Sequence, residues 1–168
     1  MKIAYADPPY IGQAKKHYRN DPICAEVDHA ELIHRMSKDF DAWALSCSSP
    51  SLREILPMCP QKSRVMAWIK PFCSFKPGVG VAYSWEPVIV YGARKRTKSQ
   101  PTVRDYISCN ITLNRGVHGA KPLEFCLWLL SVLNVLPEDE FHDLFPGSGI
   151  MADALRIHFN QGSIFNEP

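Results

Sequence analysis

Short apolar segments alternate along the chain with segments of helical periodicity, and this alternation constrains the fold more than any other feature. Strands that are buried on both faces read as nearly continuous apolar runs, and their alternation with helices favours a mostly parallel sheet. We therefore predict an α/β fold with helices on both faces of the sheet. Strands are expected over 2–6, within 40–47, and over 64–71, 86–92, 139–145 and 162–167.

The predicted helices have recognisable starts. Asp28 and Glu31 have the spacing of a capping box, and Ser49-Pro50 reads as an N-cap followed by proline at the first helical position. A long apolar helix is expected over 121–136 with a proline in its first turn, and a further helix is expected over 150–159.

Composition places the chain in a broad class. With 168 residues we expect a single domain over 1–168, and 46% apolar residues is normal for a soluble globular protein. The six cysteines lack CxxC spacing and do not cluster with the six histidines, which indicates reduced thiols and no metal site. No signal peptide precedes the first strand, and no apolar run reaches about 18 residues. These features predict a cytoplasmic protein that does not enter a membrane.

The first predicted strand ends in the motif Asp7-Pro8-Pro9-Tyr10. Proline cannot donate to a β-ladder, so the strand stops there, and the double proline fixes the direction of the Pro8 carbonyl. Asp7 supplies a second acceptor, and Tyr10 offers a flat face on which a base can stack, with about 1–3 kcal/mol per base. Two acceptors beside an aromatic face suit a planar substrate with an exocyclic amino group. An ordinary turn is the alternative, because Asp and Pro are common turn residues.

A second motif, DLFPGSG over 143–149, joins a predicted strand to a predicted helix. Its glycines allow a sharp turn and let a ligand approach the backbone without a Cβ in the way. About eighteen residues later, Glu167 is expected at the end of the next strand, where it can accept hydrogen bonds from both ribose hydroxyls of an adenosine-containing ligand. A structural turn with an incidental acid is the alternative. Both motifs follow strands, so both are expected at the ligand-binding end of the sheet.

The order of these motifs resembles that of the amino-group DNA methyltransferases that use S-adenosylmethionine. DPPY matches the family's catalytic motif, HGAKPLEFCLWLL (118–130) resembles its QKPL segment, and DLFPGSG matches its DPFxGSG except at Leu144. The segments AWIKP and WEPVIVYGARKR resemble later strands of the family, so the resemblance covers almost the whole chain. More narrowly, the chain is similar to the circularly permuted β-type order and to small members carried by phages and mobile elements. The resemblance implies a Rossmann-like methyltransferase fold.

The same resemblance implies roles for particular residues. Asp7, Pro8, Pro9 and Tyr10 would form the catalytic motif, in which Asp7 and the Pro8 carbonyl accept hydrogen bonds from the target amine. These contacts favour the pyramidal, nucleophilic amine, and Asp7 stabilises the positive charge that develops on nitrogen. No metal is required, because a sulfonium is already a good leaving group. S-adenosylmethionine would be bound by Asp143, Phe145, Gly147, Ser148, Gly149 and the ribose acid Glu167, with Lys121 and Pro122 beside its methionine end.

The implied substrate is a base flipped out of DNA. Aspartate rather than serine in the catalytic motif favours N6 of adenine over N4 of cytosine. Tyr10 would stack on one face of the base and Phe75, Tyr83 or Trp85 on the other, although packing within the protein is the alternative for those three. RNA adenine and DNA cytosine-N4 are alternative substrates. A catalytically weak, methyltransferase-like nucleic-acid-binding subunit is the alternative function.

Basic residues gather in two stretches that we expect beside the active end of the sheet. Phosphate contacts by such residues would give salt-sensitive affinity, and solvated loops are the alternative. The first stretch lies in the loop-rich insert 93–120, a minimal target-recognition region, so we expect slight sequence specificity or a partner, such as a second copy, that supplies it. The candidates are Arg94, Lys95, Arg96, Lys98 and Arg104, and, directly after DPPY, Lys15, Lys16, His17 and Arg19.

The sequence stops just after the predicted ribose acid Glu167. Relatives in the family usually continue with a helix at this point. We therefore expect a fold that is short at its C-terminus, with a cofactor pocket that is less complete on the adenine side.

Overall fold

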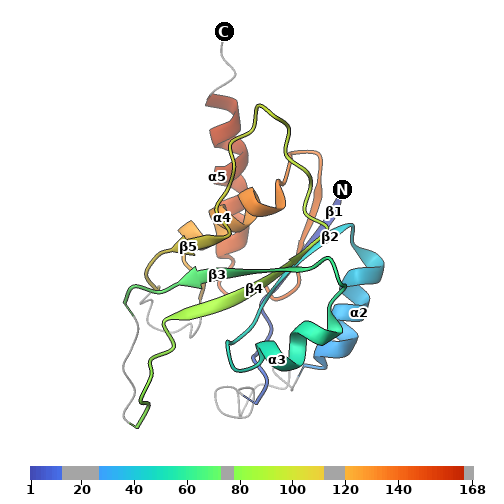
Figure 1. Cartoon of the computed structure of the whole chain (residues 1–168). Coiled ribbons are helices and arrows are strands. Elements are labelled where there is room, and N and C mark those ends of the chain that lie inside the picture. The colour runs from blue at the N-terminus through green and yellow to red at the C-terminus, as the bar shows by residue number, and fades with distance from the viewer. Residues whose placement is uncertain (13–26, 73–77, 112–119, 165–168) are drawn as a thin grey trace.

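The computed structural model describes residues 1–12, 27–72, 78–111 and 120–164, with side chains to Asn160 in the last range. Within these ranges six strands form one sheet in the order β5-β3-β4-β2-β1-β6 (Figure 1). The strands are β1 (Lys2–Ala6), β2 (Ala42–Ser46), β3 (Arg64–Ile69), β4 (Trp85–Tyr91), β5 (Tyr106–Ser108) and β6 (Glu140–Asp143). The helices are α2 (His29–Asp39), α3 (Leu52–Ile55), the 3-10 turn η2 (Leu56–Met58), α4 (Leu123–Leu133) and α5 (Ile150–Ile164).

The sheet is mixed but mostly parallel. β1 pairs in parallel with β2 and β6, and β3 with β5, whereas β4 runs antiparallel to both β2 and β3. The predicted α/β architecture is therefore confirmed. The direction of β4 determines which residues lie at each end of the sheet. β4 begins at the end of the sheet where β1, β2 and β6 finish, and it ends at the opposite end. We call these the Asp7 end and the Gly92 end of the sheet.

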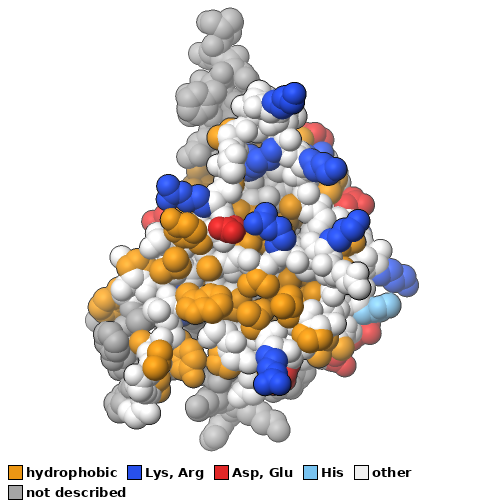
Figure 2. All heavy atoms as spheres, viewed as in Figure 1, with side chains coloured by type: hydrophobic (Ala, Val, Ile, Leu, Met, Phe, Trp, Pro, Cys, Tyr) orange, Lys and Arg blue, Asp and Glu red, His pale blue; other side chains and the backbone are white. Residues whose placement is uncertain are grey.

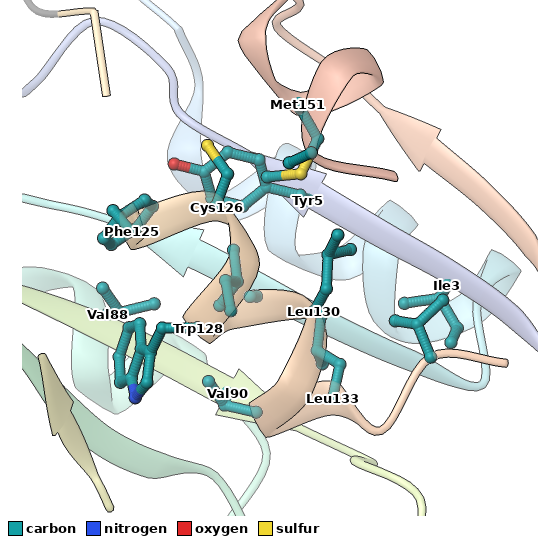
Figure 3. Close-up of a cluster of buried hydrophobic side chains, with 14 of the residues drawn as sticks. Ile3, Tyr5, Val88, Val90, Phe125, Cys126, Trp128, Leu130, Leu133 and Met151 are labelled. Carbon is teal, nitrogen blue, oxygen red and sulfur yellow. The ribbon is translucent and has the colours of Figure 1, made fainter. Parts of the chain in front are cut away.

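Helices cover both faces of the sheet (Figure 1). On one face α4 packs with α5 over the strands; Figure 3 shows Phe125 of α4 beside Tyr5 of β1, and Trp128 of α4 beside Val88 and Val90 of β4. On the other face α2 and α3 cover a second cluster around the fully buried Trp43 of β2. Because α4 is apolar around nearly its whole circumference, it forms the centre of its layer, and this fixes the position of the residues just before it.

The start of α2 follows the prediction, and the start of α3 does not. Asp28 caps α2 by accepting a hydrogen bond from the Glu31 amide at 3.0 Å. The helix predicted at Ser49-Pro50 instead begins at Leu52, after a turn closed by a hydrogen bond from the Ser51 amide to the Ser48 carbonyl. Pro50 lies within that turn.

Three further boundaries differ from expectation. Pro122 is the N-cap of α4, and the helix ends at Leu133 because Asn134 adopts a left-handed conformation with φ of 55°. The strand predicted over 162–167 is wrong for 162–164, which continue α5; a glycine inside a helix costs only about 1 kcal/mol relative to alanine, so Gly162 does not stop it. Glu167 lies outside the described residues.

The three-residue strand β5 lies inside the insert that was predicted as loop. It pairs with β3 at the margin of the sheet, and its short sequence has no apolar run to reveal it. Among the described residues, no helix is long and apolar enough to cross a bilayer.

Candidate active site

The two sequence motifs meet at the Asp7 end of the sheet. β1 and β6 are neighbours in parallel, with Tyr5 opposite Asp143, and the Leu144 amide donates to the Tyr5 carbonyl at 2.9 Å. The Asp7 turn and the glycine turn therefore leave the sheet side by side. Burial raises the pKa of Asp143, the Phe145 amide opposes this, and the charge of Asp7 adds to the rise.

The glycine turn exposes its backbone. Gly147 and Gly149 have φ of 46° and 77°, a region that residues with a side chain rarely adopt. Asp143 stabilises the turn by accepting a hydrogen bond from the Phe145 amide at 3.2 Å. A Cβ placed on Gly149 would meet nothing within 4 Å, so the space beside this backbone is open, and Ser148 is exposed in the same turn.

The carboxylate of Asp7 is held by a buried lysine. Lys121 Nζ lies 2.8 Å from Oδ1 and 2.7 Å from Oδ2 of Asp7, and the lysine side chain is 6% exposed against 20% for Asp7. Lys121 immediately precedes Pro122, the buried N-cap of α4, so the packing of α4 sets its position. Lys121 was expected beside the methionine end of a cofactor; the structure brings its ammonium group to the carboxylate of Asp7.

A second carboxylate, Glu86 of β4, completes this network. The Tyr10 hydroxyl donates to Glu86 Oε2 at 2.6 Å, and Lys70 Nζ donates to Oε1 at 2.9 Å. Lys121 Nζ is 3.3 Å from the Tyr10 hydroxyl and 3.6 Å from Glu86 Oε2. Glu86 and Lys70 were not predicted, although a glutamate inside the apolar strand WEPVIVY was a signal that could have found the first of them.

The charged groups of this network shift one another's pKa values. Burial raises the pKa of Asp7; Lys121 opposes the rise and Glu86 adds to it. Burial acts in the same direction on Glu86, but Lys121, Lys70 and Tyr10 outweigh it, so the pKa of Glu86 is lowered. Burial disfavours the charged form of Lys121, but the two carboxylates raise its pKa above the usual value. Burial, reinforced by both carboxylates, raises the pKa of Tyr10 well above its usual value, so this phenol is a neutral donor.

Comparison with known proteins agrees with this arrangement of the chain. No family model and no curated protein sequence matches it. Among solved structures, the M1.HpyAVI–SAM complex matches with a TM-score of 0.65 and 15% identity over 94% of this chain and 78% of that one. A second structure of M1.HpyAVI matches with a TM-score of 0.59 and 14% identity over 94% and 76%. The chain has the fold of M1.HpyAVI. The predicted Rossmann-like methyltransferase fold is thereby confirmed.

The aromatic residues predicted to cover a base lie in different surroundings. Tyr83 and Trp85 are 55% and 38% exposed, so they are not core residues, and Phe75 lies outside the described residues. Trp68 is an aromatic residue that was not predicted: the ammonium groups of Lys121 and Lys70 lie 5.7 and 5.6 Å from the centre of one of its rings. No cluster of three or more His, Cys, Asp or Glu suited to a metal ion is found among the residues that the structure describes.

The predicted basic stretch after β4 lies at the Gly92 end of the sheet, so its expected position beside the active end is wrong. Because β4 runs antiparallel, it delivers the chain to the side opposite Asp7. There Arg94 pairs with Asp139, and Arg96 donates to the Ser131 carbonyl near the end of α4. Lys15, Lys16, His17 and Arg19 lie outside the described residues.

The same end of the sheet contains a basic cleft of about 590 Å³. Figure 2 shows Lys and Arg side chains gathered on the upper part of the face in view, above a band of hydrophobic side chains. One acid, Asp105, lies among the lining residues. The cations that line the basic cleft are Lys62, Arg64, Arg94, Arg96, Lys98 and Arg104. Lys95 is exposed but is not among them.

Proposed function

We propose that the protein transfers a methyl group from S-adenosylmethionine to the exocyclic N6 of adenine in DNA. The observation that carries this proposal is the placement of Asp7 beside the open glycine turn at one end of the sheet. The fold shared with a protein solved with SAM supports it. The motif order described above supports the choice of an amino group as acceptor.

The residues at the glycine turn suit the proposed cofactor. Positive φ angles at Gly147 and Gly149, with open space beside the latter, allow a ligand to approach the backbone closely. When bound, S-adenosylmethionine would supply an electrophilic methyl group. Asp143, Phe145, Gly147, Ser148 and Gly149 are the residues proposed to hold it, with Glu167 on the ribose and Lys121 and Pro122 near its methionine end.

Asp7 would act on the target amine. Its carboxylate and the Pro8 carbonyl would accept hydrogen bonds from the two amine hydrogens and hold the nitrogen lone pair toward the methyl donor. The carboxylate also stabilises the positive charge that builds up on nitrogen as the bond forms. Tyr10 is held through its hydroxyl by Glu86, which fixes the plane on which a flipped base would stack.

Methyl transfer to defined substrates tests this proposal. The protein would be incubated with labelled S-adenosylmethionine and unmethylated duplex DNA, a matched duplex whose adenines already carry N6-methyl groups, and RNA of the same sequence. We expect labelled N6-methyladenine from the first substrate and no product from the second. Label on cytosine, or transfer to RNA alone, would replace the proposed substrate. Binding to DNA without transfer to any substrate would indicate the non-catalytic subunit.

We also propose that the chain works as one domain in which the insert 93–120 contacts the nucleic acid. Lys98 and Arg104 are exposed in the basic cleft, and exposed Lys and Arg side chains are the usual contacts to a phosphate backbone. The cleft extends from Met66 and Val90 toward the Gly92 end of the sheet, away from the end where Asp7 and Glu86 meet. A partner or second copy that adds specificity is compatible with so small an insert.

Replacing Lys98 and Arg104 together with alanine is expected to weaken DNA binding. The slope of log affinity against log salt should become shallower by about 0.9 for every phosphate that is no longer neutralised. Fluorescence anisotropy over a salt series measures both the affinity and the slope. Lys38→Ala, an exposed lysine of α2, is the matched control. Unchanged affinity and slope in the double variant would show that these cations are merely solvated.

A further inference from the structure

The proposed reaction needs the carboxylate oxygens that Lys121 occupies. Nζ lies within 2.8 Å of both Asp7 oxygens, and a cation at that distance cancels much of the field by which Asp7 would stabilise charge on a substrate nitrogen. A target amine cannot gain the full benefit of Asp7 while this ion pair is intact. The lysine must therefore move, and a buried ammonium group needs another partner when it does.

Glu86 is the second carboxylate with which Lys121 forms an ion pair. Its Oε2 atom lies 3.6 Å from Lys121 Nζ, so a shift of about 1 Å would form a charge-assisted hydrogen bond of ordinary length. Lys70 holds the other oxygen of Glu86 and Tyr10 donates to the first, so the carboxylate is fixed in place from both sides. The favourable charges around Glu86 keep it ionised and able to receive a cation.

We propose that Lys121 is a latch on Asp7, and that it transfers to Glu86 when the target amine binds Asp7, which makes Glu86 a positioning residue for the reaction. This inference rests on the proposed function. No covalent bond changes in the step: an ammonium group moves from one carboxylate to another, and the network keeps its charge. Tyr10 shares Glu86 with the arriving lysine, so stacking of a base on Tyr10 and release of Asp7 involve the same carboxylate.

The test is a double-variant cycle of Glu86→Gln and Lys121→Met, read by kcat and KM. In Glu86→Gln no second carboxylate can receive the lysine, so kcat should fall by on the order of 100-fold, the scale expected for misplacement by 1 Å. KM for DNA should change much less. Adding Lys121→Met removes the latch, so the double variant should recover toward the kcat of Lys121→Met alone.

Recovery separates the latch from a structural role. If Glu86 only supported the fold, the double variant would be as slow as Glu86→Gln or slower, and that result overturns the inference. If the wild-type protein makes no product, the proposed function itself is wrong. If the wild-type protein makes product but the double variant does not regain kcat, only the latch is wrong. Lys121→Gln replaces Lys121→Met if thermal melting shows that the latter is unfolded at the assay temperature.

The pH profile provides a second readout. The charged and titratable groups around Asp7 are Lys121 before α4, Cys126 of α4, Tyr10 in its own turn, Glu86 of β4, Asp143 of β6 and Tyr5 of β1. Asp7 must be ionised to accept from the amine, so activity falls as pH falls through its pKa. Removing Lys121 removes the cation that lowers this pKa, so the acid limb of kcat/KM should move to higher pH in Lys121→Met. An unmoved limb contradicts the pairing on which the latch depends.

Discussion

Asp7→Asn is expected to lower kcat for methyl transfer by about 10²–10³-fold. Asparagine keeps the shape of the side chain and one carbonyl acceptor, but it has no charge with which to stabilise the developing positive charge on nitrogen. Affinity for S-adenosylmethionine should be nearly unchanged, because the glycine turn and its Asp143 anchor are intact. Single-turnover kinetics with labelled donor and calorimetric cofactor binding measure the two effects separately.

The matched control for this experiment is Asp39→Asn, at the exposed end of α2. It makes the same chemical change away from the site and should leave kcat at the wild-type value. Full activity in Asp7→Asn, with the protein folded, would remove Asp7 from its assigned role. Equal loss in both variants would instead point to a general effect on the protein.

Lys121→Met is expected to destabilise the protein by about 3–5 kcal/mol at neutral pH, because it leaves two largely buried carboxylates, which are 20% and 18% exposed, without their shared cation. The deficit should depend on pH. Burial already raises the pKa of Asp7 above its unfolded value, and loss of Lys121 raises it further. When a carboxyl group has a higher pKa in the folded than in the unfolded protein, the free energy of unfolding decreases as pH rises from the unfolded pKa through the folded pKa. The deficit is therefore smaller at acidic pH, where Asp7 is protonated.

Urea unfolding of both proteins at acidic and neutral pH measures this dependence, with the exposed Lys38→Met as the control variant. The decrease in the free energy of unfolding caused by Lys121→Met should grow between the two conditions, whereas the control should show little decrease at either. An equal deficit at both pH values would mean that packing, and not the charge of Lys121, stabilises this part of the protein.

The sequence allowed prediction of those parts of the site that depend on a strand and the turn directly after it. Asp7 and the segment 143–149 each follow a parallel strand, and parallel strands finish at the same end of a sheet. Their proximity therefore followed from local patterns. The position of Lys121 depended instead on how α4 packs, which the helical pattern alone did not give.

One missed feature, the direction of β4, accounts for both larger differences. An apolar strand reads the same in either direction, so nothing in 86–92 showed that it runs antiparallel to its neighbours. Its reversal brings Glu86, near its start, to Asp7, and it carries the basic stretch after Gly92 to the far end of the sheet. The contact of Glu86 with the network around Asp7 was missed, and the basic residues were misplaced, for the same reason.

The antiparallel direction of β4 also allows the loop after Gly92 to be engineered separately from the residues around Asp7. The loop from Gly92 to Asp105 begins and ends far from the residues that hold Asp7, so a library of replacement loops can be introduced there without changing the network around Asp7. Gly92 itself should be kept, because a Cβ at this position would lie 2.1 Å from the Asp41 carbonyl oxygen, in a backbone conformation with φ of 69°. Under the proposed function, variants selected from such a library would differ in their contacts to nucleic acid, while the residues around Asp7 would stay the same.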